Sequence, residues 1–377
     1  MDALDRALKK NGASAYVMIG SSDNADMRYL TRFITTDPVM YIRKTGERGY
    51  IIVSQMEYQR AEQEAAAGVM TRADAGFLTI LEEEKDQWRA LARMAAGHAG
   101  GKVLVPPALP YALGYHLDAL AGVITDTGTI ASMRAKKSRH EVKAIERVQR
   151  SADRAMAHAI DCIRKSKPRN GVLWHDGKPL TSERIRSEMH SLLMQRGCLA
   201  KDTIVSCGRD TAAPHARGTG PLYEGEPVVI DIFPSDERTG YYSDMTRTIV
   251  KGDPSPEIRD MYDAVTAAHD LAASMIKPGV SGEEAYQAVV DLFSSRGYRK
   301  GREGFTHSLG HGVGLEVHEL PSLGPGGGQL SRGNVVTNEP GLYYEKIGGV
   351  RLENTGVITR TGYRSLTSFS RDLVVWA

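Results

Sequence analysis

The sequence predicts a mixed α/β protein (α/β with α+β character) built from two domains. Its 377 residues are enough for about two domains of ordinary size. Short apolar runs alternate with amphipathic stretches over the first 130 residues, whereas long amphipathic helices and glycine-rich strands follow from residue 131 onward. We therefore expect an N-terminal α/β domain over residues 1–130 and a larger second domain over residues 131–377.

The N-terminal domain is expected to be α/β because strand-like runs and helix-like stretches alternate along it. Glycines and a Pro-Pro pair separate these segments, as loop residues do. No cluster of side chains in this domain demands chemistry, so the functional site is sought in the second domain. The expected strands cover residues 15–19, 39–42, 50–54 and 102–105, and the expected helices cover residues 57–67 and 81–96.

The second domain begins with a well-marked helix and contains a weak internal repeat. Ser138 and Glu141 have the spacing of a capping box, and apolar residues then recur at helical spacing until a Lys-Pro pair at 167–168. A second helix stops at an Arg-Gly pair, and the same order returns with Lys-Pro at 277–278 and Arg-Gly at 296–297. Unless these helix ends are alike by chance, two similar halves would pack about a pseudo-two-fold axis, with a crevice suited to a site.

The composition excludes several classes of protein. With 48 basic and 46 acidic side chains the formal net charge is +2, so no global field would attract nucleic acid or an anionic membrane. No apolar run has the length of a membrane span, and the first residues do not look like a signal peptide, so we expect a cytoplasmic protein. Cys162, Cys198 and Cys207 lack paired metal-ligand spacing, which favours buried thiols in a reducing compartment over a zinc site.

Two acids are expected on neighbouring strands. Asp231 lies inside the apolar run 227–233, and Asp244 follows it after a polar turn at 239–240. A hairpin over this turn would bring the two carboxylates together, although like charges repel and a buried carboxylate is costly without a partner or a cation. The alternative is that Asp231 forms a salt bridge with an arginine such as Arg247.

The same pattern returns near the C-terminus. Glu339 ends a strand-like run, and the proline that follows holds its backbone extended. The Gly-Gly pair at 348–349 indicates a hairpin turn. Arg351 and Glu353 then lie two residues apart on a strand, so their side chains share one face and can reach one pocket.

Histidines cluster between these two pairs of acids. His307, His311 and His318 fall within residues 306–318, among glycines that argue against a helix and for close approach of the backbone to other atoms. A single histidine here would more often form a structural hydrogen bond, but three between two pairs of acids are harder to explain that way. The glycines do not form a phosphate-binding loop, because the Lys-Ser/Thr ending is missing.

Four carboxylates and one imidazole form a set of hard oxygen ligands with one borderline nitrogen. This set suits a pair of divalent first-row metals, such as manganese, cobalt, iron or zinc, better than it suits a thiolate zinc site or copper. Two such ions carry four positive charges against four acids. Their chemistry is to activate a bridging water and to polarise a carbonyl.

With these residues, the sequence resembles the pita-bread metallopeptidase family M24, which includes methionine aminopeptidase, aminopeptidase P and prolidase. The motifs occur in the family's order across the second domain. The resemblance implies that Asp231 is a terminal metal ligand and that Asp244 and Glu353 bridge two metals. His311 and Glu339 would complete the ligands of the other metal. Mn²⁺ and Co²⁺ are the first candidates for the two ions, and Zn²⁺ and Fe²⁺ come next.

The resemblance also implies roles for residues around the metals. His215, His307 and His318 would contact the substrate and steady the scissile carbonyl and the tetrahedral intermediate. Glu339 would also carry a proton from the attacking water to the leaving amine. We therefore expect these four residues, together with Arg351, to form the catalytic group.

Arg351 and the N-terminal domain narrow the resemblance to the branch of aminopeptidase P, prolidase and creatinase. The implied fold is a creatinase-like α/β domain over 1–130, followed by a pseudo-two-fold pita-bread catalytic domain over 131–377. The implied activity is hydrolysis of the Xaa-Pro bond, in dipeptides or at peptide N-termini, through a metal-bridging hydroxide. The implied partners are proline-containing dipeptides or oligopeptides and a second copy of the chain in a homodimer. Arg351 would bind a free C-terminal carboxylate, as a dipeptidase requires, or would hold Glu353.

Two other functions stay open at the level of sequence. Some members of this fold keep a similar ligand set and cleave carbon–sulfur bonds, so the ligands alone do not establish peptidase activity. Other members are metal-free binding modules, such as histone chaperones. The presence of all five ligand types argues against a binding module.

Overall fold

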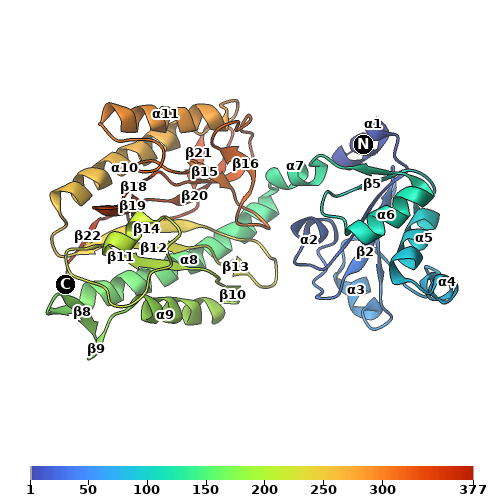
Figure 1. Cartoon of the computed structure of the whole chain (residues 1–377), viewed down its shortest axis with the longest axis horizontal. Helices are drawn as coiled ribbons and strands as arrows, with labels where there is room; N and C mark the ends of the chain where they lie inside the picture. Colours follow the sequence, from blue (N-terminus) through green and yellow to red (C-terminus); the bar gives the residue numbers. More distant parts are fainter. Residues whose placement is uncertain (1, 377) are drawn as a thin grey trace. The chain divides into compact units, whose positions relative to one another are not determined.

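The chain divides into two compact units, one ending at Arg134 and the other beginning at Ala135. The computed structural model describes residues 2–376 (Figure 1). Among these residues, no helix combines the length and the apolar composition that crossing a bilayer requires.

A six-stranded mixed sheet forms the centre of the N-terminal unit, in the order β4-β3-β2-β1-β5-β6. Side chains along β1 alternate between two hydrophobic cores, with Val17 in one and Tyr16 and Met18 in the other, so both faces of the sheet are covered. The strands are β1 Ala15–Gly20, β2 Val39–Lys44, β3 Tyr50–Val53, β4 Gly68–Thr71, β5 Val103–Val105 and β6 Val123–Thr125. The helices are α1 Ala3–Asn11, α2 Ala25–Thr31, α3 Tyr58–Glu64, α4 Phe77–Glu84, α5 Gln87–Ala99, α6 Tyr111–Ala121 and, at the boundary, α7 Thr129–Ala135.

The single helix expected over residues 81–96 is wrong, because the chain breaks there into α4 and α5. Lys85 adopts a left-handed backbone conformation with φ of 54° and ends α4. The side chain of Asp86 then accepts a hydrogen bond from the backbone N–H of Arg89 and caps the start of α5. The periodic apolar pattern continues through this break, which explains why the two helices look like one.

Two pairs of helices organise the second unit, as the internal repeat predicts. The first helix starts at the predicted capping box of Ser138 and Glu141, and α8 packs against α9 as α10 packs against α11. Figure 1 shows the two pairs on opposite sides of the strands of this unit. The longer connection in the first pair folds into a small sheet of β7, β8 and β9. The bounds are α8 Arg139–Lys165, β7 Lys167–Arg169, β8 Val172–His175, β9 Lys178–Pro179, α9 Ser182–Met194, α10 Pro256–Met275 and α11 Gly282–Ser295.

Each helix pair packs on its own sheet. The core under α8 and α9 includes residues of the sheet β11-β12-β14-β22, and the core under α10 and α11 includes residues of the sheet β16-β15-β17-β20-β21 and of the hairpin β18-β19. Ile230 and Ile232 of β12 belong to the first core, so Asp231 between them points away from the helices.

The remaining elements of the second unit are short. They are β10 Cys198–Leu199, β11 Ile204–Cys207, the 3₁₀ helix η1 Gly208–Ala212, β12 Pro227–Ile232, β13 Ser235–Asp236, β14 Met245–Lys251, β15 Gly310–Gly312, β16 Glu319–Leu323, β17 Val335–Asn338, β18 Gly341–Tyr344, β19 Gly348–Arg351, β20 Asn354–Ile358, β21 Tyr363–Ser365 and β22 Val374–Val375. Strands β12 and β14, like β17 and β20, pair antiparallel.

Candidate active site

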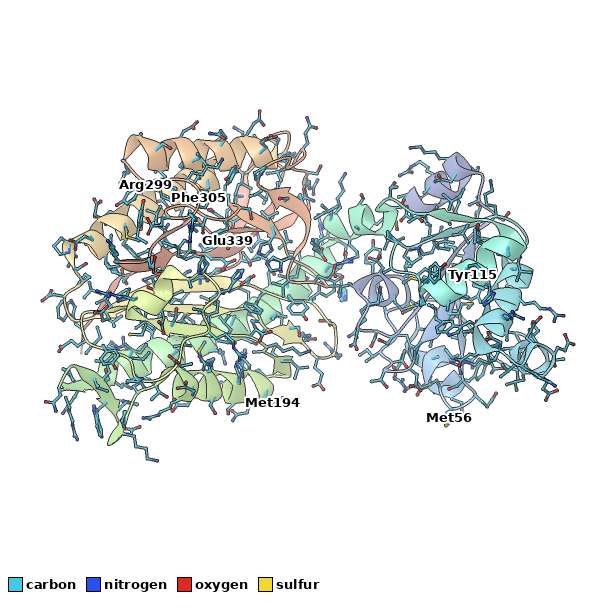
Figure 2. The ribbon with its side chains drawn as sticks, in the orientation of Figure 1. Met56, Tyr115, Met194, Arg299, Phe305 and Glu339 are labelled. Atoms are coloured by element: carbon cyan, nitrogen blue, oxygen red, sulfur yellow. The ribbon has the colours of Figure 1, made fainter. Side chains whose placement is uncertain are left out.

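A cavity of about 530 Å³ in the second unit is lined by all the site residues that the sequence singles out. Figure 2 shows one of them, Glu339, in the interior of this unit, whereas Met194 lies at its margin. The five expected metal ligands at the cavity are Asp231, Asp244, His311, Glu339 and Glu353, and the other expected site residues are His215, His307, His318 and Arg351.

The first pair of acids reaches the cavity from the β12–β14 hairpin. Asp231 is paired with Thr246 across the two strands, and Asp244 comes two residues before Thr246, directly ahead of β14. Because side chains on a strand alternate between faces, these three residues point to one side of the sheet. The structure therefore brings the two carboxylates together through a hairpin, although Asp244 lies just outside its strand.

The second pair of acids comes from the ends of two other strands. Glu339 directly follows β17, and Glu353 lies between β19 and β20. The turn of the β18–β19 hairpin is formed by residues 345–347, so the Gly-Gly pair at 348–349 opens β19 and does not form the turn itself. Glycine occupies position 349 for a steric reason, because a Cβ there would lie 2.1 Å from the backbone oxygen of Thr211.

His311 is held in place by the glycines on either side of it. A Cβ on Gly310 would lie 2.3 Å from the carbonyl oxygen of Thr337, and a Cβ on Gly312 would lie 2.2 Å from that of Leu320. Only glycine allows β15 to pass this closely between its neighbours. The backbone N–H of His311 also donates a hydrogen bond to the Thr337 hydroxyl at 3.0 Å. The alternation of glycine and histidine therefore reflects close packing around one fixed imidazole.

Three carboxylate oxygens at the site are buried and accept no hydrogen bond from the described residues. They are Oδ1 of Asp231, Oδ1 of Asp244 and Oε1 of Glu353. A buried carboxylate oxygen without a donor is costly unless a cation compensates it. Ligand atoms of Asp244, His311 and Glu353 also lie within 4.8 Å of one another. The donor set therefore fits divalent cations.

The burial that leaves these carboxylate oxygens without donors also shifts the pKa values of Asp244 and Glu353. Burial raises the pKa of Asp244 well above its usual value, and the nearby charges of Glu353 and Asp231 raise it further. Burial also raises the pKa of Glu353, with Glu339 and Asp231 adding to the effect. The cluster repels additional negative charge, and protons or metal ions can relieve that repulsion.

His311 and Glu339 shift in the opposite directions because they form an ion pair. Burial alone would lower the pKa of His311, but the hydrogen bond and charge of Glu339 raise it to about 9. Burial would raise the pKa of Glu339, but the hydrogen bond and charge of His311 lower it to about 2. The Nε2 of His311 lies 3.2 Å from Oε1 of Glu339. An imidazolium here stands where a cation would bind, so metal binding requires its proton to leave.

Arg351 holds Asp231, and Arg247 does not. The buried guanidinium of Arg351 donates from Nη2 to Asp231 Oδ2 at 2.7 Å. Its Nε donates to the Thr246 hydroxyl at 3.1 Å, and that hydroxyl donates to Glu353 Oε2 at 2.7 Å. Arg247 is directed instead to backbone carbonyls and to Asn354. Thus Arg351 pairs directly with Asp231 and reaches Glu353 only through a threonine.

Tyr343 is a site residue that the sequence does not reveal. Its hydroxyl accepts a hydrogen bond from Nη1 of Arg351 at 2.7 Å and lies 2.9 Å from Nε2 of His307. The Nδ1 of His307 lies 2.7 Å from the carbonyl oxygen of Ser308, so it carries the ring proton and Nε2 accepts from Tyr343. Both nitrogens of His307 are therefore engaged by protein groups. A tyrosine in an ordinary strand gives no signal of this connecting position.

His318 and His215 differ from His307 because both are exposed where they line the cavity. The ring of His318 lies 4.1 Å, centroid to centroid, from the ring of His311. Arg217, which no motif in the sequence marks, also lines the cavity, and its Nη1 lies 3.5 Å from Oδ1 of Asp202. These exposed groups can reach a molecule bound in the cavity.

The chain belongs to metallopeptidase family M24, whose sequence profile matches residues 143–360, and the profile of the creatinase/prolidase N-terminal domain matches residues 1–135. The chain is 33% identical over 344 residues to the Xaa-Pro dipeptidase of Pyrococcus horikoshii, which covers 89% of this chain and 88% of the relative. It is 29% identical to the Xaa-Pro dipeptidase of Lactobacillus delbrueckii subsp. lactis, covering 100% of this chain and 98% of the relative.

Solved structures give the same assignment. The prolidase from Pyrococcus horikoshii OT3 matches with a TM-score of 0.81 at 29% identity, over 98% of each chain. The Xaa-Pro dipeptidase from Bacillus anthracis matches with a TM-score of 0.83 at 26% identity, over 99% of this chain and 98% of that chain. The predicted family, the predicted fold and the prediction of a metallopeptidase are confirmed.

Addition of Mn²⁺ to the metal-free protein is expected to raise its unfolding temperature, because cations relieve repulsion among buried carboxylates and bind the folded state. A free concentration of about 100 times Kd would add about 2.7 kcal/mol for each site. Scanning calorimetry measures the shift. Asp244→Asn should lose most of it, whereas Asp263→Asn, at an exposed position on α10, should keep it. An unfolding temperature that does not respond to Mn²⁺ would contradict a metal centre.

Proposed function

We propose that this protein is a dinuclear metal-dependent peptidase that hydrolyses the Xaa-Pro bond of dipeptides or of peptide N-termini. The proposal is supported by the convergence, in one cavity, of five side chains of metal-ligand type, three of whose buried carboxylate oxygens accept no hydrogen bond within residues 2–376. The Xaa-Pro dipeptidases that are similar over most of the chain support this substrate class. The ligands are Asp231, Asp244, His311, Glu339 and Glu353, and Mn²⁺ and Co²⁺ are the first candidates for the ions.

In the proposed reaction Glu339 transfers the proton, and water and the scissile carbonyl are activated by the cations. When bound, a pair of divalent cations supplies a nucleophile from water at neutral pH and polarises the scissile carbonyl. Glu339, whose Oε1 accepts a hydrogen bond from the Thr337 hydroxyl at 3.2 Å, takes a proton from the nucleophile and passes it to the prolyl nitrogen. A prolyl amide nitrogen has no hydrogen of its own, so it must gain a proton before it leaves as an amine.

The histidines have different roles in this proposal. His318 and His215 are exposed at the cavity and contact the substrate carbonyl and its tetrahedral intermediate. His307, with both nitrogens engaged, positions Tyr343 and through it Arg351. Arg351 in turn keeps Asp231 oriented toward the metals.

A free substrate carboxylate requires a different cation from Arg351. The guanidinium of Arg351 is buried and already donates to Asp231, Thr246 and Tyr343. Arg217 lines the same cavity with 56% of its side chain exposed, and its Nη1 lies 3.5 Å from Oδ1 of the exposed Asp202. We therefore assign recognition of a dipeptide's C-terminal carboxylate to Arg217. The homodimer and the cytoplasmic location stay predictions.

Cleavage of the dipeptide Ala-Pro in added Mn²⁺ tests the activity, and comparison with the amide Ala-Pro-NH₂ tests the carboxylate contact. Arg217→Ala is expected to raise KM for Ala-Pro about 10- to 100-fold, as loss of a charged hydrogen bond does, and to leave the amide unaffected. Arg360→Ala, an exposed arginine outside the cavity, should change neither substrate.

An Ala-Pro-Ala tripeptide in the same assay separates a dipeptidase from an aminopeptidase. Failure to cleave any of the three substrates would overturn the proposed function and favour a carbon–sulfur lyase or a binding module. Equal effects of Arg217→Ala on the acid and the amide would overturn only the role of Arg217.

His318→Ala is expected to lower kcat by about 10²- to 10⁴-fold with the metals retained, because the exposed imidazole acts on the substrate and not on the ions. Steady-state kinetics and metal analysis by mass spectrometry measure the two effects. His140→Ala, at an exposed position on α8, is the matched control. Unchanged kinetics in His318→Ala would make this histidine structural.

A further inference from the structure

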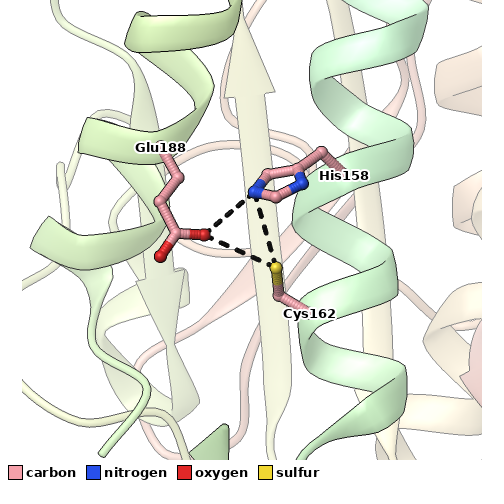
Figure 3. Close-up of side chains that lie close together, drawn as sticks. All are labelled: His158, Cys162 and Glu188. Carbon is pink, nitrogen blue, oxygen red and sulfur yellow. Dashed lines mark hydrogen bonds and ion pairs between the residues drawn. The ribbon is translucent and has the colours of Figure 1, made fainter. Parts of the chain in front are cut away.

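Three metal-binding side chains meet between α8 and α9, apart from the residues that line the active-site cavity. Figure 3 shows His158 and Cys162 on one helix facing Glu188 on the other. The Nε2 of His158 lies 2.9 Å from Oε2 of Glu188, and the Sγ of Cys162 lies 3.6 Å from the former and 3.5 Å from the latter. A histidine and a cysteine four residues apart lie on one face of a helix, which explains why they converge.

These distances are close to those around a tetrahedral zinc ion. Zinc binds sulfur at about 2.3 Å, imidazole nitrogen at about 2.0–2.1 Å and carboxylate oxygen at about 2.0–2.2 Å, which places the ligand atoms about 3.4–3.6 Å apart. Both sulfur distances already agree with this geometry. The contact between His158 and Glu188 is a hydrogen bond, and it would have to open by about half an ångström.

The surroundings of the cluster also suit a metal. Cys162 is 4% exposed, whereas the side chains of His158 and Glu188 are 38% and 31% exposed, so the cluster is open to water on one side. Arg184 donates from Nε to the other carboxylate oxygen of Glu188 at 2.9 Å and from Nη1 to the carbonyl of His175 at 2.8 Å. This arginine fixes the carboxylate with Oε2 directed at α8, as outer partners of metal ligands commonly do.

We propose that His158, Cys162 and Glu188 form a second metal site that takes Zn²⁺ or Co²⁺ and joins α8 to α9. A thiolate with an imidazole selects these ions over Mn²⁺, which prefers the oxygen-rich active centre. On binding, the thiol proton passes to solvent, the hydrogen bond between His158 and Glu188 opens, and the ring proton of His158 resides on Nδ1. A water completes the fourth position.

This proposal revises the sequence expectation that no cysteine binds a metal. That expectation considered the spacing of cysteines relative to one another. The relevant signal is a single cysteine four residues after a histidine on a helix, and the third ligand comes from another helix that the sequence alone does not place beside it.

Titration with Co²⁺ tests the site, because a thiolate ligand gives Co²⁺ an intense charge-transfer absorption in the near ultraviolet that oxygen and nitrogen ligands do not give. The proposed active centre has no sulfur ligand, so this band reports on a cysteine outside it, and the cysteine variants show which of Cys162, Cys198 and Cys207 is bound. The full-length protein is expected to show the band and to lose it when Zn²⁺ competes. Cys162→Ser should abolish the band, and Cys198→Ser, at an equally buried cysteine, should keep it.

Glu188→Gln preserves the shape of the side chain and provides a second test in case Cys162→Ser fails to fold. It should weaken Co²⁺ binding, measured by titration of the same absorption band, at least about tenfold. Absence of the band from the wild-type protein in excess Co²⁺ would show that the three residues form only a hydrogen-bonded cluster. A band that persists in Cys162→Ser, or equal affinity in Glu188→Gln, would also overturn the proposal.

Discussion

The concentration of negative charge in one buried cavity is the constraint on which the rest of the second unit depends. Each ionised carboxylate taken out of water has a penalty of several kcal/mol unless positive charge or hydrogen bonds compensate it. The positive charge of Arg351 compensates the carboxylate of Asp231, and that of protonated His311 compensates the carboxylate of Glu339. Asp244 and Glu353 are less well compensated, because Nε2 of His311 lies 3.8 Å from Oδ2 of Asp244, and burial together with the neighbouring acids raises the pKa of both carboxyl groups. The proposed pair of divalent ions would supply the positive charge that these two carboxylates need.

The fold meets this constraint by separating apolar from polar faces strand by strand. The β12 side chains on either side of Asp231 pack under the helices α8 and α9, so the acid is directed to the opposite face. Hydroxyl groups then fix the acids in place, with Thr246 donating to Glu353 and Thr337 donating to Glu339. The glycines beside His311 bring its strand close enough for the imidazole to join the same group. The cavity is thus a product of strand register and close backbone packing.

Much of this arrangement could be predicted from the chain because the responsible signals are local. An acid inside an apolar strand and an acid before proline mark Asp231 and Glu339, and the capping box marks the start of α8. The missed features depend on contacts between distant segments. Tyr343 joins His307 to Arg351, and Glu188 of α9 meets Cys162 of α8. The break between α4 and α5 was missed for a different reason, since the apolar period runs through the left-handed Lys85.

The central claim is that the four carboxylates and His311 bind two divalent ions. Anomalous diffraction from a crystal of the protein loaded with Mn²⁺ tests it most directly. The account predicts two anomalous peaks in the cavity, with Asp244 and Glu353 touching both and with Asp231 and His311 touching one each. An empty cavity, or a single ion that Asp244 and Glu353 do not contact, would contradict it.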